Sequence, residues 1–141
     1  MSKDKIGVVQ TLHTVTDPRG SLSVAEQFKE VPFEIKRCFW MYGVPEGQGR
    51  GGHAHKTLKQ FVIALNGSFC ITLDNGRKKE SYILDSPDKG LLIDACLWAE
   101  LYHFSTGAVC LVLASDLFDE ADYLGTYGEF MDYISGRYKL V

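Results

Sequence analysis

Short apolar segments separated by turn residues make up most of this chain. Segments rich in β-branched and aromatic residues lie at 6–16, 21–26, 33–44, 60–65, 69–73, 77–85, 91–104 and 108–115. Between them, Asn66-Gly67 and Asn75-Gly76 place residues that tolerate positive φ at hairpin positions. Many short strands with closely spaced turns predict an all-β sandwich or barrel. No linker interrupts the pattern, so we expect a single domain over residues 1–141.

The last part of the chain has a different period. After Asp119, a residue type suited to a helix N-cap and followed by further acids, apolar residues recur at helical spacing. These residues are Leu124, Tyr127, Phe130, Met131 and Ile134. The pattern predicts one short C-terminal helix that begins just after Asp119 and packs against the barrel.

Composition and charge exclude several classes of protein. The chain is 45% hydrophobic and 23% charged, which is typical of a folded globular protein. A net charge of −3, with no basic stripe, argues against nucleic-acid binding. No apolar run approaches the ~20 residues that span a bilayer, so we expect no membrane segment. The four cysteines lie singly in apolar segments without CxxC pairing, which predicts reduced thiols and a cytoplasmic protein.

The segment from Arg50 to His55, Arg-Gly-Gly-His-Ala-His, carries the clearest chemical signal. Side chains alternate along a strand, so His53 and His55 point to the same side. The spacing from this pair to Gln60 and then Gly67 resembles the first signature of the cupin barrels, which usually have Glu at the position of Gln60. The resemblance predicts a jelly-roll β-barrel with two imidazoles in its cavity, after an irregular glycine-rich loop at 45–52.

A metal site is incomplete in this sequence. A divalent ion in such a barrel is held by three or four ligands, commonly three His and one Glu. Gln60 replaces the acid, and Leu101 stands where the second cupin signature would place the third histidine. His13 and His103 fall at neither ligand position. We therefore predict no metal and no other cofactor, with a metal-dependent cupin oxygenase as the alternative.

Paired histidines without a metal suit proton transfer. An imidazole has an ordinary pKa near 6.5, so it both accepts and returns a proton close to neutral pH. The planar guanidinium fork matches a phosphate group. Arg19, Arg37 and Arg50 are therefore candidates for binding a diphosphate.

Several motifs together resemble the TDP-4-oxo-6-deoxy-D-glucose 3,4-oxoisomerases, the sugar-nucleotide ketoisomerase branch of the cupins. The resemblance extends from about residue 10 to 134, and its motifs are Ile35-Lys36-Arg37, Arg50 to Lys56, Leu65 to Ser68, Leu84 to Pro87, Gly90-Leu91, Trp98-x-Glu100, Val112 to Asp116, and Asp119-Glu120-x-Asp122-Tyr123. It implies a homodimer, a TDP-linked 4-oxo-6-deoxy sugar as substrate, and a role in making 3-amino-3,6-dideoxyhexoses for bacterial surface polysaccharides. It also implies that His53 and His55 are catalytic and that Arg37 and Arg50 contact phosphate.

The implied reaction moves a ketone from C4 to C3 of the sugar. The C3 hydrogen lies α to the C4 carbonyl, so a histidine can remove it to give a 3,4-enediol, and reprotonation at C4 completes the transfer. We favour His55 as the base, supported by His53. Because both histidines share one face, proton return to the same face predicts a 3-oxo-6-deoxygalactose product. The arginine at position 19 also resembles the residue that the galacto-forming members of the family have at this turn.

Further residues complete the predicted binding site. Tyr42, on a strand of alternating aromatics, is a candidate for stacking on thymine, and Gln60 lies at the acid position of the motif. Trp98 is a further candidate for binding the substrate. Glu100 could orient a histidine or hydrogen-bond the sugar, or be a paired structural acid, and His103 is the candidate to replace a missing proton relay.

That relay is missing because members of the family carry His or Arg between Trp98 and Glu100, where this chain has Ala99. A catalytically weakened TDP-sugar-binding protein is therefore a second alternative. Finally, the apolar segment 6–16 would leave an open sheet edge, which proteins normally cover. Exchange of this strand between two copies would cover both edges and bring Arg19 to the neighbour's pocket, so we predict a homodimer of this kind.

Overall fold

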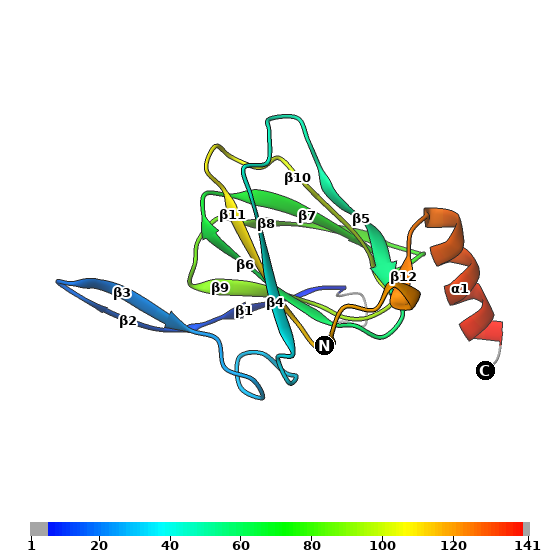
Figure 1. Cartoon of the computed structure of the whole chain (residues 1–141), viewed down its shortest axis with the longest axis horizontal. Helices are drawn as coiled ribbons and strands as arrows, with labels where there is room; N and C mark the ends of the chain where they lie inside the picture. The colour runs from blue at the N-terminus through cyan, green and yellow to red at the C-terminus, as the bar shows by residue number, and fades with distance from the viewer. Residues whose placement is uncertain (1–5, 140–141) are drawn as a thin grey trace.

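Two five-stranded antiparallel sheets face each other in the computed structural model, which describes residues 6–139 (Figure 1). One sheet has the order β1 (Val8–Thr11), β9 (Lys89–Ile93), β6 (Gln60–Asn66), β11 (Val109–Ala114), β4 (Arg37–Tyr42). The other has the order β12 (Tyr123–Leu124), β5 (Arg50–His55), β10 (Trp98–Tyr102), β7 (Phe69–Asp74), β8 (Lys79–Leu84). A separate hairpin, β2 (His13–Asp17) and β3 (Gly20–Val24), projects from one side, and α1 (Tyr127–Lys139) lies at the other. The predicted all-β jelly roll with one C-terminal helix is confirmed.

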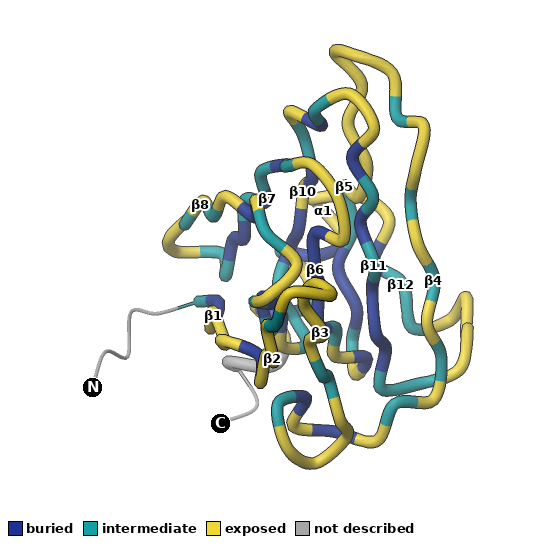
Figure 2. The backbone as a smooth tube through the Cα atoms, turned by 90° about the vertical axis from the view of Figure 1, so that its left-hand side faces the viewer, coloured by how far each residue is buried: buried dark blue, intermediate teal, exposed yellow. Residues whose placement is uncertain are grey.

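The core lies between the two sheets, because alternate residues of each strand point inward. In β6, Val62 and Ala64 belong to this main cluster, whereas Phe61 and Ile63 lie on the outer face. Val31 and Phe33 cover that outer face of the first sheet. Figure 2 shows the result: the central strands are buried, whereas the hairpin and much of β4 are exposed.

The helix α1 covers the outer face of the second sheet. Its residues Phe130 and Ile134 form a cluster with Trp98 of β10, Leu124 of β12 and Ala54, the residue between the two histidines of β5. The strand that carries the histidines therefore has a packed apolar layer behind it. No helix among residues 6–139 is long and apolar enough to cross a bilayer.

The predicted strand at 6–16 is wrong in one respect, because it is two strands. β1 pairs with β9 in the first sheet, and β2 pairs only with β3. Leu12 separates them: its side chain is buried in the cluster under the first sheet, and its N–H donates to the carbonyl of Asp88 at 2.8 Å. This anchor ends the pairing with β9, and the chain leaves the barrel as the hairpin.

The predicted strand at 91–104 is also two strands, β9 and β10, which belong to opposite sheets. Between them, Asp94 accepts a hydrogen bond from the N–H of Ala95, and Cys96 has a φ of 64°. A left-handed residue cannot continue a strand, so the chain turns here from one sheet to the other.

The C-terminal helix begins later than the sequence pattern indicates. Asp119 caps a short 3₁₀ helix, Glu120–Asp122, rather than α1. The cap of α1 is at Thr126, whose hydroxyl accepts from the N–H of Glu129, while the carboxylate of Glu129 accepts from the N–H of Thr126. Leu124, which fits the helical spacing, lies in β12 instead, because β12 pairs with β5.

Candidate active site

A cavity of about 240 Å³ lies between the two sheets. Its polar lining comes from Arg50, His53, Gln60 and Tyr123, and the remaining lining residues are Phe39, Trp40, Met41, Gly51, Val62, Ile93, Ala99, Leu101 and Val112. A largely apolar pocket with a few converging polar groups is typical of a small-molecule site.

Two glycines at the start of β5 precede the histidines, of which His53 lines this cavity, whereas His55 is buried behind it and is not a lining residue. Gly51 and Gly52 have φ values of 86° and 72°, and a Cβ on Gly51 would lie 2.9 Å from the carbonyl oxygen of Ala99. The register with β10 shifts here, so that Gly51 faces Glu100 and His53 faces Ala99. The glycines thus form a β-bulge, which re-aims the residues that follow. The predicted loop at 45–52 is wrong at its end, because the strand already begins at Arg50.

His53 and His55 lie on the same side of β5, as the alternation predicts. Their ring centroids are 4.9 Å apart with the rings almost perpendicular. Tyr123 completes the group, with its ring 5.1 Å from that of His53 and 4.4 Å from that of His55. The three rings form one aromatic cluster at the cavity.

A carboxylate fixes the proton on His55. Nδ1 of His55 is 3.1 Å from Oδ2 of Asp122. Asp122 itself accepts hydrogen bonds from the N–H and hydroxyl of Thr57, at 2.8 and 2.9 Å, and from the N–H of Leu58 at 3.3 Å. An ionised carboxylate only accepts, so Nδ1 of His55 donates and Nε2 carries a lone pair. Nε2 is buried and has no hydrogen-bond partner among residues 6–139.

Burial keeps both imidazoles neutral near pH 7. Burial lowers the pKa of His55, and the neighbouring His53 lowers it further, against the opposing effect of Asp122. Burial likewise lowers the pKa of His53, against a hydrogen bond from its ring to the backbone of Gly51. Burial alone would raise the pKa of Asp122, but the hydrogen bonds led by those of Thr57 hold it below its usual range. The site therefore contains an ionised acid beside two neutral bases.

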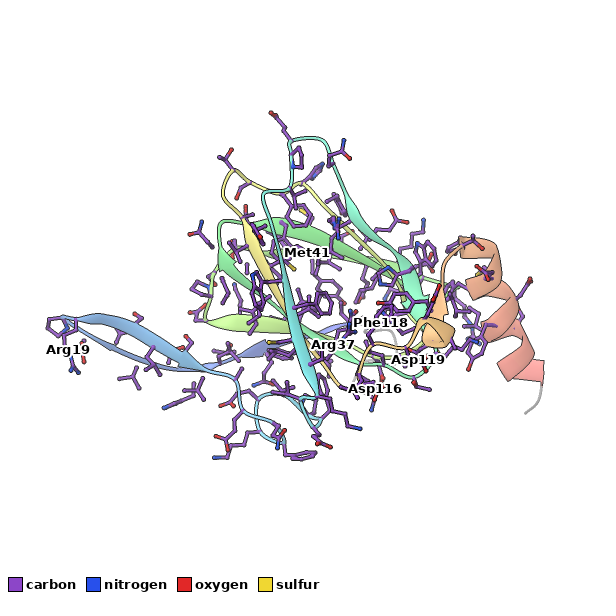
Figure 3. The ribbon with its side chains drawn as sticks, in the orientation of Figure 1. Arg19, Arg37, Met41, Asp116, Phe118 and Asp119 are labelled. Carbon is purple, nitrogen blue, oxygen red and sulfur yellow. The ribbon has the colours of Figure 1, made fainter. Side chains whose placement is uncertain are left out.

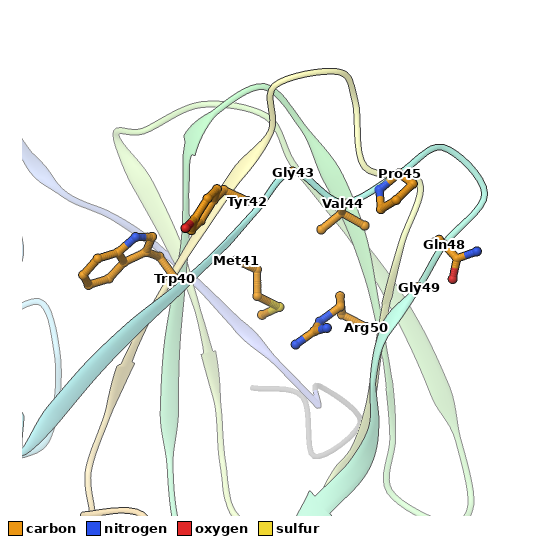
Figure 4. Close-up of a pocket in the computed structure, with 9 residues that line it drawn as sticks. All are labelled: Trp40, Met41, Tyr42, Gly43, Val44, Pro45, Gln48, Gly49 and Arg50. Carbon is orange, nitrogen blue, oxygen red and sulfur yellow. The ribbon is translucent and has the colours of Figure 1, made fainter.

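The two predicted phosphate-binding arginines of the barrel have different surroundings. Arg50 lines both this cavity and a second hollow of about 430 Å³ under the loop 43–49, where Figure 4 shows it facing Met41. Arg37, at the other end of β4, has its guanidinium 5.0 Å from the ring of Phe39 and 5.6 Å from that of Phe118 (Figure 3). Nε of Arg37 is buried without a hydrogen-bond partner.

Gln60 lines the cavity as expected, but Tyr42 does not. Along β4 the half-buried residues are Arg37, Phe39 and Met41, whereas Tyr42 is exposed. The side chains of this strand that face inward are those that pack in the core. Tyr42 is on the opposite side of the strand, so it points away from the cavity.

Trp98, Glu100 and His103 also lie outside the cavity. The inward residues of β10 are Ala99 and Leu101, so Trp98 and Glu100 are on its outer face, joined by a hydrogen bond of 2.8 Å from the indole Nε1 to Oε2. His103 follows the end of the strand with a φ of 55°, exposed against the ring of Tyr102. In this chain, none of the three reaches the histidine pair.

Arg19 lies at the exposed tip of the β2–β3 hairpin (Figure 3). Its guanidinium is 2.6 Å from the carboxylate of Asp17, which also accepts from the Arg19 N–H. The hairpin directs Arg19 away from the cavity of its own chain.

Sequence reasoning missed Asp122 and Tyr123 as site residues. Their acidic segment has the pattern of a helix start, and only the pairing of β12 with β5, which sets Tyr123 opposite His55, brings Tyr123 to the cavity and Asp122 to His55. Within the described part of the chain, no three His, Cys, Asp or Glu side chains come together as a metal site requires. The neutral residues Gln60 and Leu101, at two of the cupin ligand positions, both line the cavity.

Two facing antiparallel sheets, with a histidine pair on one strand and an arginine lining the cavity between them, are typical of the cupin class. The FdtA family model (WxcM-like, C-terminal) matches residues 6–135, and the chain belongs to this family. The TDP-4-oxo-6-deoxy-alpha-D-glucose-3,4-oxoisomerase of Aneurinibacillus thermoaerophilus is 42% identical over 121 residues, which is 86% of this chain and 87% of that protein.

Solved structures agree with this assignment. A 3,4-ketoisomerase from Helicobacter canadensis has 42% identity and a TM-score of 0.89, over 92% of this chain and 97% of that one. A histidine-to-asparagine mutant of the 3,4-ketoisomerase QdtA from Thermoanaerobacterium thermosaccharolyticum, in complex with TDP-4-keto-6-deoxyglucose, has 34% identity and a TM-score of 0.90, over 94% and 96%. The resemblance to the sugar 3,4-ketoisomerases is confirmed, and the chain is an isomerase of this family.

Proposed function

We propose that this protein converts TDP-4-oxo-6-deoxy-D-glucose into its 3-oxo isomer, with the galacto configuration at C4. The observation that carries the proposal is the state of His55: Nδ1 is held by Asp122, and Nε2 is an unpartnered, buried lone pair. Named relatives support the substrate, since one is a TDP-4-oxo-6-deoxyglucose 3,4-oxoisomerase and another was solved with TDP-4-keto-6-deoxyglucose.

In the first step, Nε2 of His55 removes the proton from C3. The C–H electron pair forms the C3–C4 double bond, and the C4 carbonyl oxygen takes a proton, which gives the 3,4-enediol. Asp122 stabilises the imidazolium that His55 becomes, as an acidic partner does in other His–carboxylate pairs. The ring of His53, 4.9 Å from that of His55, is the nearest imidazole able to exchange a proton with the oxygen.

In the second step, the enediol collapses in the opposite direction. The O3 proton leaves, the C3 carbonyl forms, and C4 takes the proton from His55, so that both histidines return to their starting state. The reaction is internally balanced, with no electron acceptor consumed. We infer that no metal is needed, because proton transfer by imidazole accounts for each step.

The sizes of the two hollows suggest how the substrate lies. The cavity of about 240 Å³ suits one hexose ring and not a whole sugar nucleotide. The nucleoside diphosphate then extends toward the adjoining hollow of about 430 Å³. Arg50 lines both, so we assign the diphosphate to Arg50, and binding energy from this remote group positions C3 at His55. The charge of Arg37 lowers the pKa of His55, and we assign Arg37 to the sugar end.

The galacto product follows from the geometry of β5. In the gluco sugar the hydrogens on C3 and C4 lie on opposite faces of the ring, and in the galacto sugar they share a face. His53 and His55 share one side of the strand, so removal and return from that side give galacto. Relatives from Campylobacter jejuni named TDP-quinovose and TDP-fucose 3,4-ketoisomerases are 43% and 35% identical, so both product configurations occur among relatives of this chain.

We infer that two copies of the chain exchange their N-terminal hairpins. An isolated two-stranded hairpin is marginally stable in water. In this hairpin the apolar residues Val15 and Leu22 are 51% and 60% exposed. A second copy of the chain would cover these side chains. The exchange would carry Arg19 to the neighbouring barrel.

We also propose that the protein is a cytoplasmic enzyme of deoxysugar biosynthesis. Its four free cysteines support the cytoplasmic location.

The direct test is incubation with TDP-4-oxo-6-deoxyglucose in deuterium oxide, with C3 and C4 followed by NMR. We expect the ketone to move to C3, with deuterium at C4 in the fraction of turnovers in which the proton held on His55 exchanges with solvent before it is returned. A TDP-sugar-binding protein without activity would bind TDP and leave the sugar unchanged, with no exchange at C3. A metal-dependent oxygenase would instead consume O₂ and lose activity with a chelator.

A further inference from the structure

Trp98 and Glu100 form a hydrogen-bonded pair on the outer face of the barrel, outside the cavity. The Trp98 side chain belongs to a residue only 8% exposed, and its ring packs against Tyr127 and Phe130, with centroids 5.5 and 6.0 Å away. Its only polar atom, Nε1, donates to Glu100 at 2.8 Å. Such a buried indole with a satisfied N–H is held in one orientation.

This hydrogen bond spans the irregular point of β10. The register of β10 with β5 shifts between Ala99 and Glu100. The hydrogen bond from Trp98 to Glu100 joins the residues on either side of Ala99 and so crosses this shift. On the facing strand, the same point is occupied by Gly51, whose close approach to the Ala99 carbonyl leaves no room for a Cβ. The side-chain bond therefore fixes the local bend of β10 at the bulge.

Two contacts connect this point to His53. In the register of the two strands, Gly51 lies opposite Glu100 and His53 lies opposite Ala99, the residue between Trp98 and Glu100. Ala54, next in sequence to His53, is 1% exposed and packs in the same outer cluster as Trp98. The backbone that carries His53 is thus paired with the Trp98–Glu100 segment of β10 and packed against Trp98 through Ala54.

We propose that Trp98 and Glu100 are positioning residues that act through the bulge to orient the His53 ring over the cavity. Neither touches the reacting atoms. The proposal rests on the proposed function for its effect on turnover, but not for its effect on His53 itself. It also gives the Trp98-x-Glu100 motif a role that its place outside the cavity does not otherwise explain.

The test compares Glu100→Ala with Glu100→Gln. The alanine variant loses the acceptor of the indole N–H, and we expect kcat to fall about tenfold, as for other partners that orient an active-site residue. KM should stay within about twofold, because nothing that binds the substrate changes. The His53 resonances of the ligand-free protein should shift, and their titration midpoint should change. Glutamine keeps an acceptor oxygen and should restore both kcat and the resonances.

Trp98→Phe provides a second route to the same change, since it removes the donor and keeps an aromatic ring. We expect it to match Glu100→Ala, and the double variant to be no slower than either single one. Lys79→Ala is the control, because Lys79 lines the same outer groove as Trp98 and Glu100. This control should leave kcat and the His53 resonances unchanged.

Two results would overturn the proposal. In the first, Glu100→Ala leaves both kcat and the His53 resonances as they were. In the second, it raises KM with kcat intact, which would mean that Glu100 contacts the substrate. If the unmodified protein does not move the ketone at all, the proposed function fails, whereas the NMR comparison on ligand-free protein still decides the positioning role.

Discussion

The strand that carries the histidines and the hairpin that carries Arg19 are held in opposite ways. β5 pairs with β10 and β12, and its Ala54 packs on the cluster under α1. The β2–β3 hairpin pairs only with itself, and its cross-strand contacts include hydroxyl pairs such as Thr14 with Ser23 at 2.8 Å. The groups proposed for proton transfer are therefore assembled inside one chain, whereas the proposed role of Arg19 requires the surface of a second copy.

The largest effect should come from removing the base. His55→Asn keeps the size of the side chain and the donor to Asp122 but has no imidazole lone pair. We expect kcat to fall by about 10²–10⁴, the usual contribution of a general acid–base group. The loss should be measured by the rate of ketone transfer, with TDP binding retained.

His103→Asn is the matched control for that variant. His103 is exposed against Tyr102, outside the cavity, so its replacement should leave the rate unchanged. A large loss in His103→Asn with little loss in His55→Asn would contradict the placement of the chemistry on β5.

Asp122→Asn should have the next largest effect. The amide no longer favours the proton on Nδ1 of His55, so Nε2 is less often the free base, and kcat should fall about 10–100-fold. Because Asp122 raises the pKa of His55, the acid limb of the kcat profile should also move to lower pH. A profile that does not move would mean that Asp122 does not interact with His55 in solution.

The pH dependence of the unmodified protein has a definite sign. Burial holds the pKa of His53 and His55 below the ordinary value of about 6.5. Between those lowered values and about 6.5 the unfolded chain binds more protons than the folded one, so stability rises with pH in that window and is lost as pH falls through it. Denaturant unfolding at pH 5 and pH 7 measures this difference, and the midpoint at pH 5 should be lower.

Leu22→Asp tests the other half of the comparison. Leu22 is already exposed in the single chain, so the charge should change monomer stability little. If a second copy covers it, losing the burial of one leucine, about 1.5–3 kcal/mol, weakens the dimer about 10–100-fold. Sizing at several concentrations measures the shift. Ile83→Asp, at an equally exposed apolar residue of β8, is the control and should leave the elution volume unchanged.

The sequence predicts that side chains alternate along each strand better than it predicts which of the two sides faces the cavity. Alternation alone puts His53 and His55 on one side, and the adjacent glycines and Gln60 indicate which side faces the cavity. For β10 the same alternation leaves two choices, and the motif Trp98-x-Glu100 favours the wrong one. Packing decides it: Ala99 and Leu101 fit between the sheets, while the large indole needs the space under α1.

Contacts between distant segments set the other limit. Asp122 is 67 residues from His55, and the two meet only because the two-residue strand β12 pairs with the end of β5. No local pattern specifies so short a pairing. The helix caps at Asp119 and Thr126 show the same limit of local patterns. Both residues are good N-cap types, and the pairing of β12 with β5 determines that α1 starts after Thr126.

The smallest effect we expect is at Ala99, which lies directly opposite His53 and lines the cavity. Ala99→His would add a third imidazole beside the existing pair, on a different strand. Because His55 and Asp122 already form a complete base, the new ring should raise turnover only a few-fold or change the configuration at C4. Product analysis by NMR distinguishes these two results. An unchanged rate together with an unchanged product would show that the histidines of β5 suffice, and that a proton relay at position 99 is dispensable in this chain.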